Sequence, residues 1–149
     1  MPDNGKKILL ADDDALIAGL HMEALKAAGF SVELAFDGEQ AIEKLEKMRE
    51  EGVMPAAVLL DIMMPKKNGL DVLRFMKGHE AFKRTPIIML TNLADTEDVE
   101  KALEEGAVLY MVKVQYTPRE VAAKVCEVVA SYAGDKPITL TPSAGTSGR

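Results

Sequence analysis

Three acidic residues in this sequence follow apolar runs directly, where an ionised side chain is costly. Asp12 and Asp13 come after ILLA, and Asp61 comes after AAVLL. A carboxylate at the end of a buried strand is normally paired, protonated or bound to a metal. Two further polar residues follow later apolar runs, Thr91 after IIML and Lys113 after VLYMV. These five residues are the candidates for a functional site.

The elements that must position these residues are predicted by the apolar runs themselves. Five short runs, taken here as strands, alternate with amphipathic helical patterns, at 7–11, 31–35, 56–60, 87–90 and 108–112. This alternation is typical of an α/β domain with a parallel sheet. The first, third and fourth runs are apolar, as in strands that helices cover on both faces. The second contains Glu33 and is predicted to lie at the edge.

Capping residues predict where five helices begin. A side chain that accepts a hydrogen bond from a free main-chain N–H favours each start. Proline at the first helical position strengthens the last signal, and Gly29 and Gly106 indicate two helix ends. The predicted caps are Asp14, Asp37 with Gln40, Asn68, Asp95 or Thr96, and Thr117 with Glu120.

All five candidate residues fall at the carboxyl ends of predicted strands. In an open parallel sheet that edge binds ligands, at the point where the strand order reverses. The second strand contributes no candidate, which fits a position outside the first. We therefore predict a flavodoxin-like, doubly wound sheet of five parallel strands, in the order 2-1-3-4-5, with five helices.

The gathered carboxylates predict a metal site. Two unit charges ~4 Å apart repel by roughly 4 kcal/mol at an effective dielectric of 20. A hard divalent cation with oxygen ligands, Mg²⁺ in our prediction, would neutralise Asp12, Asp13 and Asp61. A phosphate could then approach the acidic pocket, with Lys113 and Thr91 contacting its oxygens.

Composition limits the other possibilities. The chain has 149 residues, 48% hydrophobic and 28% charged, which predicts one globular domain over 1–133. Residues 134–149 lack periodicity and are predicted to form a flexible tail without an output domain. The net charge of -6 disfavours direct nucleic-acid binding. No apolar run reaches the ~18 residues of a membrane span, so we expect a cytoplasmic protein without membrane contact. Cys126 is predicted to be a core residue.

Four motifs together resemble the receiver domain of two-component response regulators. They are ILLADD, LLDIMMPKKNG, PIIMLT and YMVK, and the resemblance covers about 6–132. It implies that Asp61 accepts a phosphoryl group from a sensor histidine kinase or a phosphotransfer protein. Asp13 and Asp61 would bind Mg²⁺ directly, Asp12 mainly through water, and Met63 through its main-chain carbonyl. Lys113 would pair with the phosphoryl group.

The resemblance also implies a conformational switch. Thr91 would move to the phosphoryl group and Tyr110 would swing inward, reshaping the face of the fourth helix, fifth strand and fifth helix. That face would control a downstream protein target and could form a homodimer. Such a protein is a phosphoacceptor that assists its own phosphorylation and dephosphorylation, not an enzyme.

The sequence departs from the family at several positions. Val114 follows Lys113 where proline is common, and a non-proline cis bond costs ~3 kcal/mol, so a trans bond is expected. Asn92 is bulkier than the usual residue. Met63 and Leu93, at positions that tune hydrolysis in this family, are apolar and predict a long-lived aspartyl phosphate.

Three other functions fit parts of the pattern. A receiver could act as a protein-protein scaffold without phosphorylation. A phosphatase of the haloacid dehalogenase type also uses an aspartate nucleophile, but needs a second aspartate where Met63 stands. A flavodoxin-like FMN carrier would need a hydroxyl- and glycine-rich loop in place of Asp12 and Asp13.

Overall fold

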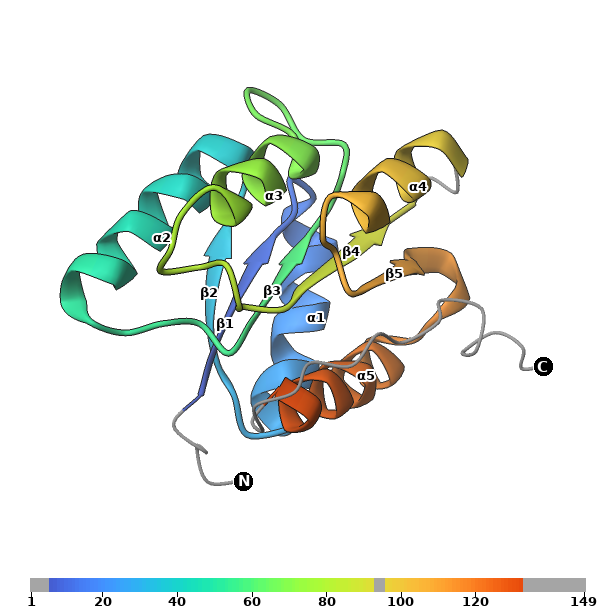
Figure 1. The fold of residues 1–149 in the computed structure, drawn as a ribbon. Helices are drawn as coiled ribbons and strands as arrows, with labels where there is room; N and C mark the ends of the chain where they lie inside the picture. Colours follow the sequence, from blue (N-terminus) through green and yellow to red (C-terminus); the bar gives the residue numbers. More distant parts are fainter. Residues whose placement is uncertain (1–5, 93–95, 133–149) are drawn as a thin grey trace.

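A single sheet of five parallel strands forms the centre of the molecule. The computed structural model describes residues 6–92 and 96–132. The strand order is β2-β1-β3-β4-β5, as the sequence predicts (Figure 1). The strands are β1 (Lys7–Ala11), β2 (Ser31–Ala35), β3 (Ala57–Leu60), β4 (Ile87–Thr91) and β5 (Leu109–Val112).

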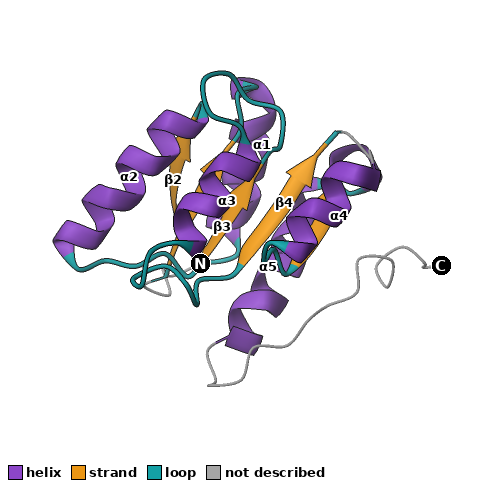
Figure 2. Cartoon of the chain, turned by 45° about the horizontal axis from the view of Figure 1, so that its top comes forward, coloured by secondary structure: helices purple, strands orange, loops and turns teal. Residues whose placement is uncertain are grey.

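Helices cover both faces of this sheet. On one side lie α1 (Ala15–Ala27) and α5 (Pro118–Tyr132), and the other three helices lie on the opposite side (Figures 1 and 2). Those three are α2 (Gly38–Glu51), α3 (Gly69–Lys77) and α4 (Thr96–Glu104). The arrangement is the predicted doubly wound α/β fold. A short 3-10 helix, η1 (Lys113–Gln115), follows β5 directly and was not predicted.

The central strands are apolar throughout because both of their faces are covered. Successive side chains of a strand point to opposite faces. In β1, Ile8 and Leu10 join the cluster beneath α1 and α5, whereas Leu9 and Ala11 join the cluster beneath the other helices. All four side chains are buried. Glu33 of β2 instead pairs with surface lysines, which confirms β2 as an edge strand.

Helix caps form largely where the sequence predicts them. Asp14 accepts from the first turn of α1, and Asn68 forms a capping box at α3. Thr117 and Glu120 bond each other's main-chain N–H groups at the start of α5. At α2, Asp37 caps as expected.

Several predicted details are wrong. At the start of α2, the side-chain oxygen of Gln40 accepts a hydrogen bond from the main-chain N–H of Phe36 and not from that of Asp37. The reciprocal bond of the predicted capping box is therefore made to the residue before the cap. Both β3 and β5 begin one residue later than predicted, and β4 continues to Thr91. Cys126 is exposed, because α5 buries the stripe through Val125 and Val129 and Cys126 lies outside it.

Some predictions concern residues outside the described ranges, namely Asp95 as a cap, Leu93, and the tail at 134–149. Across 6–92 and 96–132, none of the helices combines the length and apolar character needed to cross a membrane.

Close backbone approach at Gly69 joins the start of α3 to the end of β3, and we expect Gly69→Ala to destabilise the protein. A Cβ there would overlap the main-chain oxygen of Asp61. Relieving the overlap requires a backbone shift, so the free energy of unfolding should fall by about 2 kcal/mol in urea titrations. Gly19→Ala is the control. Gly19 lies inside α1 with open space at its Cβ position, so alanine should stabilise by about 1 kcal/mol. Equal effects of the two changes would contradict this account.

Candidate functional site

Sheet pairing brings the first two acidic groups to adjacent strand ends. Main-chain N–H groups continue the pairing one residue beyond the strands, from Asp12 to Ala35 and from Asp61 to Ala11, both at 3.0 Å. The chain leaves β1 towards β2 on one side and β3 lies on the other, so this is the point where strand order reverses. The crevice outside such strand ends is where doubly wound proteins bind ligands.

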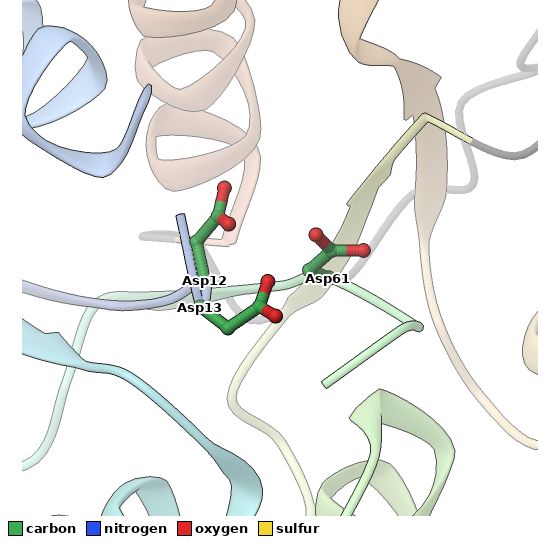
Figure 3. Close-up of side chains that lie close together, drawn as sticks. All are labelled: Asp12, Asp13 and Asp61. Atoms are coloured by element: carbon green, nitrogen blue, oxygen red, sulfur yellow. The ribbon is translucent and has the colours of Figure 1, made fainter. Parts of the chain in front are cut away.

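Three carboxylates gather at this crevice. Oxygens of Asp12, Asp13 and Asp61 lie within 4.8 Å of one another. Asp12 and Asp61 are buried, with 1% and 6% of their surface exposed, whereas Asp13 is open to solvent. Figure 3 shows the three side chains lying close together, with the carboxylate of Asp13 pointing towards Asp61. The cluster is thus buried on one side and accessible on the other.

Lys113 connects two of these carboxylates. Its Nζ donates to Oδ2 of Asp12 at 2.6 Å and to Oδ2 of Asp61 at 2.7 Å. Hydrogen bonds between charged groups at these distances are strong. One ammonium group faces three carboxylates, so the cluster keeps two negative charges when all are ionised.

The electrostatics follow from burial. Desolvation raises the pKa of Asp61, and the nearby charge of Asp12 adds to this, although hydrogen bonding to Lys113 opposes it. Desolvation lowers the pKa of Lys113, but its hydrogen bonds to Asp12 and Asp61 outweigh that effect and the net pKa is raised. Lys113 therefore remains a cation, and ionised Asp61 depends on positive charge nearby.

The cluster fits a divalent cation. Carboxylate oxygens are the preferred ligands of small hard cations, and two uncompensated negative charges match a double positive charge. Asp13 offers a route from solvent, because it is the exposed member. Asp12, Asp13 and Asp61 could therefore hold a metal ion.

The remaining predicted residues lie on β4 and β5 and in the turn after β3. Thr91 is fully buried at the end of β4, in register with Val112, which precedes Lys113. Tyr110 on β5 is half-buried against the core beneath α2, α3 and α4. The main-chain N–H of Met63 donates to Oδ1 of Asp61 at 3.1 Å, while 59% of the Met63 surface is exposed.

Two of the positions that depart from the family pattern, Val114 and Asn92, line the same cavity as Lys113. Val114 is 82% exposed in η1, and its peptide bond with Lys113 is trans, as expected, because residues 6–92 and 96–132 contain no cis bond. Asn92 is also exposed, directly after Thr91.

One residue near the site, His21, was not among the candidates that the sequence indicated. His21 is 4% exposed, and it lines a cavity of about 380 Å³ together with Lys113. A signal was present, because His21 falls on the buried stripe of α1 between Ala18 and Leu25, where an apolar residue is expected. Its closeness to Lys113 depends on how α1 packs and could not be read from spacing.

Comparison with known proteins places this chain and its fold in an established family. The family model described as the response regulator receiver domain matches residues 8–125. Chemotaxis response regulator CheY4 of Vibrio cholerae superposes with a TM-score of 0.72 at 30% identity, covering 83% of this chain and 98% of that one. A CheY-like receiver domain protein from Methanospirillum hungatei JF-1 gives 0.74 at 28% identity, covering 86% and 96%. The chain belongs to the response regulator receiver domain family.

Curated relatives extend beyond the matched region. DNA-binding response regulator MtrA of Mycobacterium tuberculosis is 38% identical over 120 residues, which is 80% of this chain and 49% of that protein. Transcriptional regulatory protein CpxR of Escherichia coli is 40% identical over 119 residues, 80% and 47%. The chain spans about half the length of these relatives.

The ion pair at Lys113 leads to a stability prediction. Lys113→Met should lower the free energy of unfolding by about 3 kcal/mol at neutral pH without divalent cations, because two buried carboxylates lose their cation. The deficit should shrink as pH falls, since protonated Asp61 needs no partner. Denaturant titrations at several pH values measure both effects.

Lys66→Met is the matched control. The Lys66 side chain is 61% exposed and its Nζ lies 3.8 Å from Asp37, so its loss should cost about 0.5 kcal/mol or less. A pH-independent deficit in Lys113→Met, or one no larger than that of Lys66→Met, would contradict the prediction.

Proposed function

We propose that this receiver domain is a phosphorylation-dependent switch of a two-component system in which Asp61 accepts the phosphoryl group. The donor would be a sensor histidine kinase or a phosphotransfer protein. The observation that carries the proposal is Lys113, whose ammonium group lies between the carboxylates of Asp12 and Asp61. The ammonium group beside Asp61, together with a divalent cation held by the acidic cluster, would let Asp61 receive an anion that the carboxylates alone would repel.

The proposed transfer is an in-line substitution at phosphorus. A carboxylate oxygen of Asp61 forms the new bond, and the bond from phosphorus to the donor's histidine nitrogen, or to the acyl oxygen of a small acyl phosphate, breaks. The leaving atom keeps the electron pair. During the transfer, Lys113 would donate at least one N–H to the phosphoryl oxygens. The main-chain N–H of Met63 donates to Oδ1 of Asp61 and holds that oxygen in place.

Mg²⁺ is the cation that we propose for the acidic cluster. Asp13 and Asp61 would bind it directly, Asp12 mainly through water, and the main-chain carbonyl of Met63 would complete the protein ligands. When bound, it would neutralise negative charge on the carboxylates and on the entering phosphoryl oxygens.

The signal would leave the site through Thr91 and Tyr110. Thr91 is buried between the ends of β3 and β5, and Tyr110 is half-buried two residues before Val112 on β5. A shift of Thr91 towards the phosphoryl group would open space for Tyr110 to turn inward. The face of α4, β5 and α5 would change, controlling a downstream protein or forming a homodimer.

The proposed role is that of a phosphoacceptor and not of an enzyme with multiple turnover. The unit would be residues 1–133, acting in the cytoplasm and without direct contact with nucleic acid or membrane. The net charge of -6 supports the absence of nucleic-acid binding.

Asp61→Asn tests the phosphoacceptor directly. Incubation with acetyl phosphate and Mg²⁺ should add one phosphoryl group to the wild type, read by intact mass. Asp61→Asn should lose the label almost completely, because the amide is a poor nucleophile. Asp14→Asn should label like the wild type, since asparagine also caps helices and Asp14 lies outside the acidic cluster. Chelation of Mg²⁺ should suppress labelling in both active proteins.

Other outcomes of this experiment separate the alternatives. Absence of any adduct on the wild type would favour a phosphorylation-independent scaffold. Continuous hydrolysis of a generic phosphomonoester would favour an aspartate-nucleophile phosphatase.

Met63→Asn should shorten the lifetime of the aspartyl phosphate. The exposed methionine side chain cannot orient an attacking water, whereas an amide can. General acid-base assistance typically accelerates a reaction by about 10² to 10⁴. Positioning of the attacking water by one amide should account for about tenfold of that acceleration, so the label should be lost about ten times faster. Loss of the label from purified protein measures the lifetime. A wild-type label that decays rapidly, and equally fast in Met63→Asn, would refute the idea.

A further inference from the structure

His21 presents an unexplained buried polar atom next to the site. Among the described residues, its Nδ1 is the buried side-chain nitrogen or oxygen that lacks a hydrogen-bond partner. Buried polar atoms without partners cost free energy, and each one in a folded protein calls for an explanation. A leucine at this position of the α1 stripe would avoid that cost, so the imidazole is expected to gain a partner in another state.

Lys113 carries the complementary donor. An ammonium group has three N–H donors, and the described part of the chain supplies acceptors for two of them, on Asp12 and Asp61. The lysine side chain is only 7% exposed, so its third N–H has little access to solvent. A donor and an acceptor, each incompletely satisfied, therefore border the same cavity.

The environment of the imidazole favours its acceptor form. Desolvation lowers the pKa of His21, and the positive charge of Lys113 lowers it further, against smaller contributions from the charge of Asp12 and from a hydrogen bond between the ring and the main chain of Ile17. The ring is therefore neutral at neutral pH, and a neutral imidazole has one nitrogen that can accept. The cavity is lined by apolar Ile17, Leu20 and Val114, and Asn92 and Tyr116 add polar side chains to its wall.

We propose that His21 is a positioning residue for Lys113, and that its Nδ1 accepts an N–H of the lysine once metal or phosphoryl contacts engage the oxygens of Asp12 and Asp61. This inference rests on the proposed phosphoacceptor function. In the state described here, the two carboxylates hold the ammonium group. When their oxygens turn to other partners, a neutral acceptor on the α1 side keeps Lys113 at the site without competing for the cation.

Nitrogen NMR of histidine-labelled wild-type protein tests the contact itself. The chain has two histidines, and His79 stacks with Phe75 and Phe82 after α3, so it serves as an internal control. Mg²⁺ alone should shift the Nδ1 resonance of His21 towards that of a hydrogen-bonded acceptor and leave His79 unchanged. An unmoved His21 resonance, or equal movement of both residues, would overturn the proposal.

Two variants test the consequence. His21→Leu keeps an apolar side chain in the stripe and removes the acceptor, so phosphorylation by acetyl phosphate should slow by about fivefold while the melting temperature of metal-free protein rises by about 3 °C. His21→Asn places an amide oxygen near the position of Nδ1 and should recover most of the rate. A purely structural role predicts instead that stability and rate change together.

The results distinguish this inference from the function on which it rests. Wild-type protein that takes up no phosphoryl group would refute the proposed function, and the Mg²⁺-dependent NMR shift would still decide whether His21 contacts Lys113. Normal wild-type labelling with an unimpaired His21→Leu variant, or with His21→Asn as slow as His21→Leu, would overturn the role of His21 alone.

Discussion

The contact between Lys113 and two buried carboxylates is the constraint on which the site depends. The lysine is 101 residues from Asp12 and 52 from Asp61 along the chain, so only the sheet order brings the three together. Lys113 follows β5, and the end of β4 lies between it and Asp61. The long lysine side chain spans that distance, and Thr91 is fully buried at the end of the intervening strand.

Gathering three carboxylates at one strand edge serves the site but lowers the stability of the fold. The cluster holds three carboxylates, of which Lys113 bonds only Asp12 and Asp61, and burial already raises the pKa of Asp61. The metal-free fold must therefore tolerate unfavourable charge, and it does so because β1, β3 and β4 are buried on both faces. A cation bound at the acidic edge would relieve this charge, so we expect ligands that bind there to change the stability of the protein. The buried sheet therefore provides the stability of the fold, and the acidic edge provides its sensitivity to bound ligands.

Features that follow from strand periodicity were predictable from sequence, whereas features set by helix orientation were not. Apolar runs such as IIML predicted buried strands, and the residues after them predicted the site, because parallel strands end at one edge. Cys126 was wrongly assigned to the core because the whole of α5 is rich in apolar residues, and only packing decides which stripe is buried. The relation of His21 to Lys113 was missed for the same reason. At α2, the Gln40 side chain could accept from the main-chain N–H of Phe36 or from that of Asp37, and the local sequence does not distinguish the two.

The turn after β5 shows why Val114 affects the surface more than the charge contacts. The main-chain oxygen of Lys113 accepts from the N–H of Tyr116 at 3.3 Å, which closes η1 and needs nothing from residue 114. Lys113 consequently points inward to Asp12 and Asp61 while Val114 is 82% exposed. Leu20 on α1, half exposed, lines the same cavity as Val114. With Val114 at this position, Lys113 therefore keeps its contacts with Asp12 and Asp61, and the rim of the cavity carries a branched apolar side chain.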